Sequence, residues 1–288
     1  MSFLRAACLG LNLTLGALTF GGLTLGAVNP ALAQSDTITA DQQSRLWDAL
    51  DMPGALDVMR REGLSLADEV AEQYLVGRTG ASWQDAVATI YDGDAMGDMM
   101  MDGMVADLGG ADPDPMLAFF ESDLGQRIIT LEMSAREVFL DSDMEEAARD
   151  RVRTDAIDPD RMELIDEFIA VNDLVDYNTS GAMNTNVAFL RGLATSEIFE
   201  MGEQEILDGV WGDSDASRSD TEEWLRAYLS TAYQPLSDED LRAYIAFSET
   251  EAGQRLNRAL FVGFGDMYTY QYNALGLAVA QQLAGQDL

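Results

Sequence analysis

Five methionines lie between residues 96 and 104, and each carries a thioether sulfur that can bind a metal ion. On a helix, Met96, Met99, Met100 and Met104 would share one broad face. Thioether sulfur is a soft ligand that selects Cu(I), so the cluster predicts a copper site. Because most of the 15 methionines lie elsewhere, we favour the alternative that these side chains are adaptable packing residues.

Two aspartate-rich segments are similar to the start of a calcium-binding EF-hand loop. The segment from Asp92 carries Met96 at its fifth position and Gly103 at its twelfth, where a bidentate Glu is required. The segment from Asp213 has Arg218 where the turn requires Gly. We interpret both as solvated acidic loops, with weak calcium binding as the alternative.

A run of polar side chains interrupts the apolar pattern after residue 171. It consists of Asn172, Tyr177, Asn178, Asn184, Asn186 and Arg191. Buried amides need hydrogen-bond partners, so these residues either line a ligand groove or join two helices, and we favour the second role.

Paired carboxylates could also support glycoside hydrolysis. With 51 Asp and Glu residues, however, a pair at a suitable separation carries no information. The best aromatic grouping is Trp211, Trp224, Tyr228 and Tyr233. We interpret it as part of a helical core.

The residue types that are absent exclude several functions. The 288-residue chain has no His, all 17 basic residues are Arg, and the one Cys is Cys8. Cys8 lies in a segment that we interpret below as a removable signal peptide. The chain that remains after its removal therefore excludes Ser-His-Asp triads, Cys-His nucleophiles, Schiff-base lysines and zinc sites with His or Cys. A net charge of −34 argues against nucleic acid and anionic lipid as partners. We expect no cofactor.

Residues 1–33 have the pattern of a secretory signal peptide. An apolar stretch follows Arg5, and Ala31-Leu32-Ala33 forms a small-x-small cleavage site. Cleavage after Ala33 predicts an exported, periplasmic protein without stable membrane insertion. An uncleaved anchor is the alternative, since the apolar stretch approaches the roughly 20 residues that span a bilayer.

Apolar residues recur at spacings of three and four through most of the chain, which predicts an all-α protein. Residues 118–128 align without gaps with residues 246–256, and six of the eleven positions are identical. This internal repeat predicts two similar helical units, 34–156 and 157–288, packed like a helical bundle around an internal pseudo-two-fold axis.

The repeated segment has the features of a corner between two helices. In each copy the Ser or Thr can cap the second helix, and the Gly permits close packing. The alternative is a charged binding site built from the Glu and the Arg of each copy; we favour the structural corner. The repeat residues are Phe119, Glu121, Ser122, Gly125, Gln126, Arg127, Phe247, Glu249, Thr250, Gly253, Gln254 and Arg255.

The order Phe-x-x-Ser/Thr-x-x-Gly-Gln-Arg follows a Leu-Ser-Asp-Glu-Asp-Leu start at residues 236–241. Together they resemble the bacterial exported family called domain of unknown function 2059. The match is best over residues 235–267, and a second, degenerate match covers residues 112–139. The resemblance implies a helical, exported fold and brings no activity or catalytic residues.

We therefore predict a non-enzymatic cell-envelope protein that binds another protein or a small ligand in a groove between helices. Metal binding, by Cu(I) at the methionine cluster or by calcium at the acidic segments, is the second hypothesis. A carboxylate-dependent, glycan-active enzyme is the third.

Overall fold

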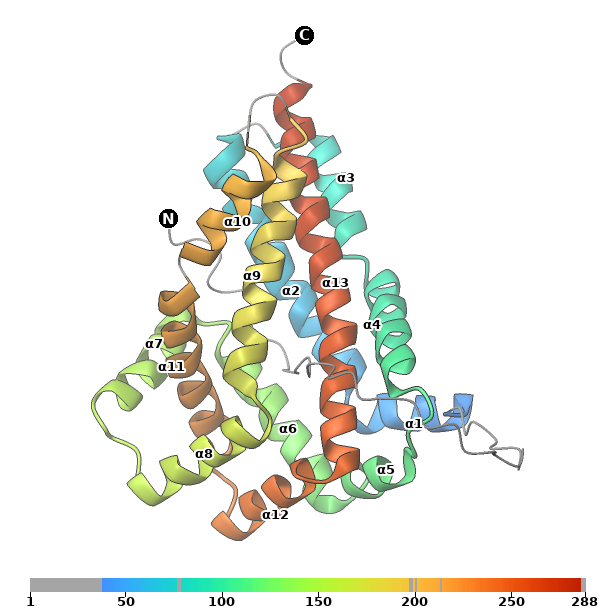
Figure 1. Ribbon diagram of the computed structural model, residues 1–288, viewed down its shortest axis with the longest axis vertical. Helices are drawn as coiled ribbons and strands as arrows, with labels where there is room; N and C mark the ends of the chain where they lie inside the picture. Colours follow the sequence, from blue (N-terminus) through green and yellow to red (C-terminus); the bar gives the residue numbers. More distant parts are fainter. Residues whose placement is uncertain (1–37, 77–78, 197–198, 200, 213, 286–288) are drawn as a thin grey trace, which may run out of the picture.

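The computed structural model describes residues 38–76, 79–196, 199, 201–212 and 214–285 (Figure 1). The predicted signal peptide, including Cys8, lies outside these residues. The described chain is helical and has no strand, which confirms the all-α prediction. A membrane-spanning helix is not found in this part of the chain.

The described elements follow one another along the chain as helices joined by short connections. In order they are α1 (Ala40–Ala49), α2 (Met52–Val70), a π-helical turn η1 (Ala71–Leu75), α3 (Ala81–Ile90), α4 (Gly93–Leu108), α5 (Asp114–Phe120), α6 (Asp123–Val138), α7 (Ser142–Arg153), α8 (Pro159–Val171), α9 (Leu174–Leu193), α10 (Glu203–Gly212), α11 (Ser214–Ala232), α12 (Asp238–Ser248) and α13 (Glu251–Ala284).

The last helix, α13, runs through the length of the molecule. Its 34 residues span roughly 50 Å, and α9 and α4 pack along it on different sides (Figure 1). At the closest crossings a glycine lies against a glycine: Gly263 against Gly103 of α4, and Gly276 against Gly192 of α9. The missing side chains allow the backbones to approach more closely than ordinary helix pairs do.

The helix contacts correspond in pairs between the two halves of the chain. α1 packs on α5 as α8 packs on α12, and α2 packs on α4 as α9 packs on α11. In addition, α4 of the first half packs on α13, while α11 of the second half packs on α6. An internal pseudo-two-fold axis would produce this reciprocal pattern, although the duplication itself remains an interpretation of the sequence.

Two hydrophobic cores hold the helices together. The larger surrounds α13 and includes Met100 and Phe264, and the smaller lies among α6, α8, α11 and α12 and includes Ile128 and Leu225. Each core contains residues from both halves of the chain. Each half therefore buries apolar surface that the other half would otherwise leave exposed to water.

The two repeated segments form corners with the same local geometry. In the first, the Ser122 hydroxyl accepts a hydrogen bond from the backbone N–H of Gly125, and Thr250 and Gly253 repeat this contact in the second. A Cβ on either glycine would lie 2.2 Å from the carbonyl oxygen of the preceding repeat phenylalanine. Glycine is thus required where the second helix crosses the end of the first.

In each half, the glutamine that follows the corner glycine connects the ends of two helices. The Gln126 side chain donates to the carbonyl oxygens of Phe120 at 2.7 Å and of Ala49 at 2.8 Å, which end α5 and α1. Gln254 makes the same pair of contacts at the ends of α12 and α8. One side chain in each half thus satisfies carbonyl groups at the ends of two helices.

We expect Gln126→Ala to lower the free energy of unfolding by about 1–3 kcal/mol, because two helix-end carbonyls lose their donor. Urea denaturation measures this loss. Gln281→Ala, at an exposed position of α13, is the control and should change stability by less than about 0.5 kcal/mol. Equal effects of the two variants would show that the hydrogen bonds of Gln126 contribute nothing to stability.

Candidate ligand-binding site

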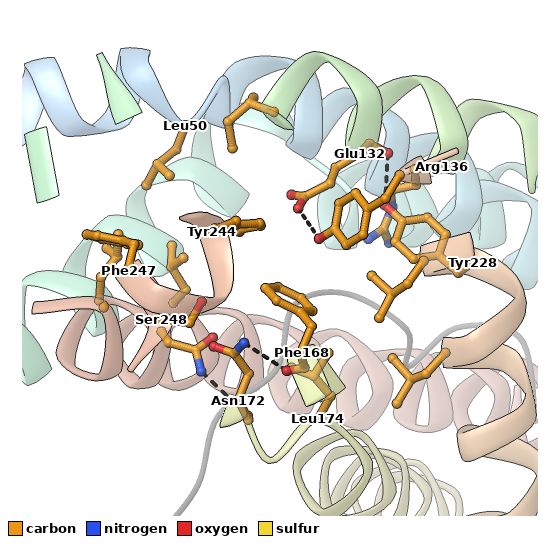
Figure 2. A pocket seen from close by; sticks show the side chains of 18 of the residues that line it. Leu50, Glu132, Arg136, Phe168, Asn172, Leu174, Tyr228, Tyr244, Phe247 and Ser248 are labelled. Carbon is orange, nitrogen blue, oxygen red and sulfur yellow. Dashed lines mark hydrogen bonds between the residues drawn. The ribbon is translucent and has the colours of Figure 1, made fainter. Parts of the chain in front are cut away.

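A pocket of about 90 Å³ lies where α6 of the first half meets α8, α11 and α12 of the second (Figure 2). Aromatic rings form much of its wall, from Phe120, Phe168, Trp224, Tyr228, Tyr233, Tyr244 and Phe247. Its polar lining residues are Glu132, Arg136, Asn172, Asn178, Ser248 and Asn257. We call this site the aromatic pocket.

The stacked rings of Phe119 and Phe247, whose centroids are 4.1 Å apart, lie beside the pocket where the two repeat corners meet. Tyr244 also stacks on Phe119, with a centroid distance of 5.5 Å. Phe168 tilts against Tyr244 at 4.8 Å and meets Tyr233 edge-on at 5.5 Å. The wall of the pocket is therefore a continuous aromatic layer built by both halves.

Glu132 of α6 is the acid of the pocket, and its side chain points toward the tyrosines (Figure 2). The residue is 9% exposed, and its Oε1 accepts a hydrogen bond from the Tyr233 hydroxyl at 2.7 Å. The Tyr228 hydroxyl donates to the backbone carbonyl of Glu132 at 2.8 Å. Two tyrosines thus position this turn of α6 and its carboxyl group.

The environment of Glu132 changes its acidity. Burial raises the pKa of the carboxyl to about 7, against a smaller lowering by the hydroxyl groups of Tyr233 and Tyr244. Burial also raises the pKa of both tyrosines, so they remain neutral donors. Near neutral pH the carboxyl therefore exchanges between its neutral and charged forms.

Arg136 lies one turn after Glu132 but is paired with a different acid. Its guanidinium donates two hydrogen bonds to the carboxylate of Glu62 on α2, at 3.1 and 2.6 Å. Burial lowers the pKa of Arg136, but Glu62 together with Tyr268 and Tyr228 outweighs this effect, and the net shift of the pKa is upward. The positive charge at this wall of the pocket is thus already balanced by Glu62.

The pocket combines apolar and polar residues at equivalent positions of the two halves. The pairs are Glu132 and Leu260, Ile129 and Asn257, Phe120 and Ser248, and Leu50 and Asn172. The first three pairs are each separated by the 128-residue offset of the repeat: Phe120 and Ser248 lie within the aligned segments, and the other two pairs lie just after them on α6 and α13. The fourth pair precedes Asp51 and Asp173, which both have left-handed backbone conformations with φ of 46° and 50°. The polarity of the pocket thus comes from differences between the halves.

The predicted polar run contributes two residues to this pocket. The amides of Asn172 and Asn178 donate to carbonyl oxygens one turn earlier, those of Phe168 at 2.9 Å and Leu174 at 2.8 Å. These amides bind their own backbone and do not join two helices through those contacts.

The other four residues of the run lie elsewhere. Tyr177 stacks on Phe261 of α13 at 4.5 Å, and Asn184 is exposed. The Oδ1 atom of Asn186 is buried without a hydrogen-bond partner among the described residues. Arg191 forms an exposed ion pair with Glu203. The six residues therefore do not converge on one groove.

The methionine cluster lies on α4 and faces the larger core. Met96, Met100 and Met104 are fully buried, and Met99 is partly buried against the same core. A Cβ on Gly263 of α13 would lie 2.5 Å from the sulfur of Met100. This packing gives each methionine a structural role, and the copper site remains a prediction.

The segment that begins at Asp92 is a helix, so its interpretation as an acidic loop is wrong. Asp92 accepts a hydrogen bond from the backbone N–H of Ala95 and caps α4, which continues to Leu108. The N-cap preference of Asp thus outweighs the loop pattern. Asp213 lies outside the described residues. Among those described, no three Asp, Glu or Cys side chains gather closely enough to hold a metal ion.

The charged residues of the two repeat corners do not form a common site. Glu121 pairs with Arg45 at 2.7 Å, and Arg127 pairs with Asp240. Arg255 donates to backbone carbonyls at the end of α4, and Glu249 is exposed. These contacts tie the corners to neighbouring helices.

The predicted aromatic grouping is largely reproduced at the pocket. Trp224 stacks on Tyr228 at 4.8 Å, and both line the pocket together with the buried Tyr233. Trp211 is 64% exposed and lies on α10.

Glu132 is one of 51 acids in the chain and was not among the candidate residues that the sequence indicated. Two signals were nevertheless present. Ile128, Glu132 and Ala135 share one helix face, so an acid interrupts an apolar stripe. Extending the repeat alignment also pairs this acid with Leu260.

Comparison of the chain with protein-family models, curated proteins and solved structures gave no match. The resemblance to domain of unknown function 2059 therefore remains an expectation from the sequence.

Proposed function

We propose that the protein is a non-enzymatic binding protein of the bacterial cell envelope, and that the aromatic pocket receives a small ligand. The observation that carries this proposal is a buried, aromatic-lined pocket with a few convergent polar groups, which is the usual form of a ligand site. The predicted signal peptide supports a location in the periplasm.

The size of the pocket sets the size of the ligand. Its volume of about 90 Å³ is several times the 10–15 Å³ that one water occupies and is of the order of the roughly 150 Å³ cavity that binds benzene. A ligand group with a few carbon atoms fits this space.

The acids around the pocket favour binding over glycoside hydrolysis. That reaction uses two carboxyl groups about 5–9.5 Å apart. Among the described residues that line the pocket, Glu132 is the sole Asp or Glu. The arrangement therefore offers one carboxyl for recognition and lacks the second one that catalysis needs.

Filling the pocket tests the proposal. Benzene or 1-butanol, present at about a hundred times its Kd, should stabilise the wild-type chain by about 2.7 kcal/mol. Ser248→Phe places in α12 the residue that α5 carries as Phe120, and we expect it to remove this stabilisation. Ala246→Phe, at an exposed position of α12, should leave it intact. Thermal melts with and without each compound measure the effect, and an equal response of the three chains would contradict the proposal.

A further inference from the structure

We propose that the ligand of the aromatic pocket is a small organic cation of the alkylammonium class, whose charged nitrogen pairs with Glu132. The inference rests on the proposed function, because it assigns the chemistry of the ligand for the same pocket.

The first observation is that, in the part of the chain that the structure describes, no basic side chain is paired with Glu132. Among the described residues, Arg136 is the one basic side chain that lines the pocket, and it is paired with Glu62 at 2.6 Å. The Glu132 carboxyl instead accepts a neutral hydrogen bond from Tyr233. When Glu132 ionises, its charge is buried without a counter-charge, and a buried charge is costly unless it is paired.

The second observation is that the fold does not require an acid at this position. The equivalent position of the second half is Leu260, which lines the same pocket. A leucine would bury apolar surface there without the desolvation cost of a carboxyl. The acid therefore serves something other than packing.

The third observation is the wall around the acid. Phe168 and Tyr244 lie beside the space that Glu132 faces (Figure 2), and Tyr233, which donates to the Glu132 carboxyl, lines the same pocket. A cation over the face of an aromatic ring is attracted by the negative charge of the ring face, most strongly where water is excluded. The net charge of −34 adds a long-range attraction for cations and repels anions.

Binding of a cation at Glu132 should release a proton that can be measured, provided that the other titratable groups facing Glu132 do not change their charge. They are Tyr228 from α11, Tyr233 from the segment after α11, Tyr244 from α12, and the Arg136–Glu62 pair from α6 and α2. The tyrosines stay neutral and Arg136 stays charged, because the pKa of each tyrosine and of Arg136 is raised. Since the pKa of Glu132 is about 7, an ammonium that binds at pH 6 should displace about one proton, and at pH 8 almost none.

The test compares three probes of similar shape by isothermal titration calorimetry at pH 8: n-butylamine, 1-butanol and butyrate. We expect the amine to bind at least about tenfold more tightly than the alcohol, and butyrate to show no binding. Glu132→Gln should abolish the advantage of the amine over the alcohol. Glu137→Gln removes an acid from an exposed position of the same helix, and we expect it to bind like the wild type.

The outcomes separate the two proposals. Binding of 1-butanol without a preference for the amine would overturn the ammonium inference and leave the proposed function in place. Absence of binding by all three probes would overturn both. An amine affinity that Glu132→Gln does not change would place the cation elsewhere on the acidic surface and overturn the inference. If Glu132→Gln does not fold, proton release by the wild type decides: release at pH 6 supports the inference, and no release contradicts it.

Discussion

Replacing Gly276 by alanine should lower the free energy of unfolding by about 3 kcal/mol, at the upper end of the usual cost of overpacking. The added Cβ would lie 2.2 Å from the carbonyl oxygen of Phe189 and 3.0 Å from the backbone nitrogen of Leu193. Both atoms belong to α9, which cannot yield as the end of a side chain can. The two longest described helices would have to separate.

Gly265 provides a matched control on the same helix. Apart from the backbone of its own helix, no atom of the described residues lies within 4 Å of the position that its Cβ would take, and the residue is exposed. Gly265→Ala should therefore raise stability by about 0.5–1 kcal/mol through helix propensity alone. Urea denaturation of both variants measures the difference, and a Gly276→Ala chain as stable as Gly265→Ala would show that α9 and α13 do not cross at this glycine.

The second large effect is a dependence of stability on pH that originates at Glu132. Its folded-state pKa is raised from 4.5 to about 7, so the folded chain binds the proton more tightly than the unfolded chain. The resulting stabilisation is fully present below pH 4.5 and is lost as the pH rises through 7. The shift corresponds to about 3 kcal/mol.

Comparison with Glu132→Gln isolates this contribution from the other acids. Glutamine keeps an oxygen that accepts from Tyr233 but cannot ionise, so the variant should lose about 3 kcal/mol less stability than the wild type between pH 4.5 and 8. Glu137→Gln should follow the wild type. Denaturant unfolding at half-unit pH steps gives the curves; parallel curves for wild type and Glu132→Gln would show that Glu132 titrates normally.

These predictions concern a molecule whose helical corners are encoded locally. Ser122 and Thr250 cap their helices as their sequence context indicates, because an N-cap depends on a hydroxyl and on backbone groups within three residues. The all-α class follows for a similar reason, since apolar spacings of three and four select the helix. The misinterpreted segment after Asp92 is instructive, because the same residue type both starts helices and binds calcium in loops.

The sequence by itself determined the helical class, the matching corners and the exclusion of His and Lys chemistry, since each depends on residue identity or on neighbours within a few positions. Only the tertiary structure decided which acid is buried. Glu132 becomes distinct because α11, α12 and the segment between them, about a hundred residues later in the chain, bring Tyr228, Tyr233 and Tyr244 against it. Burial and its effect on acidity are properties of long-range packing, and packing of this kind is not visible in the order of residues along one helix.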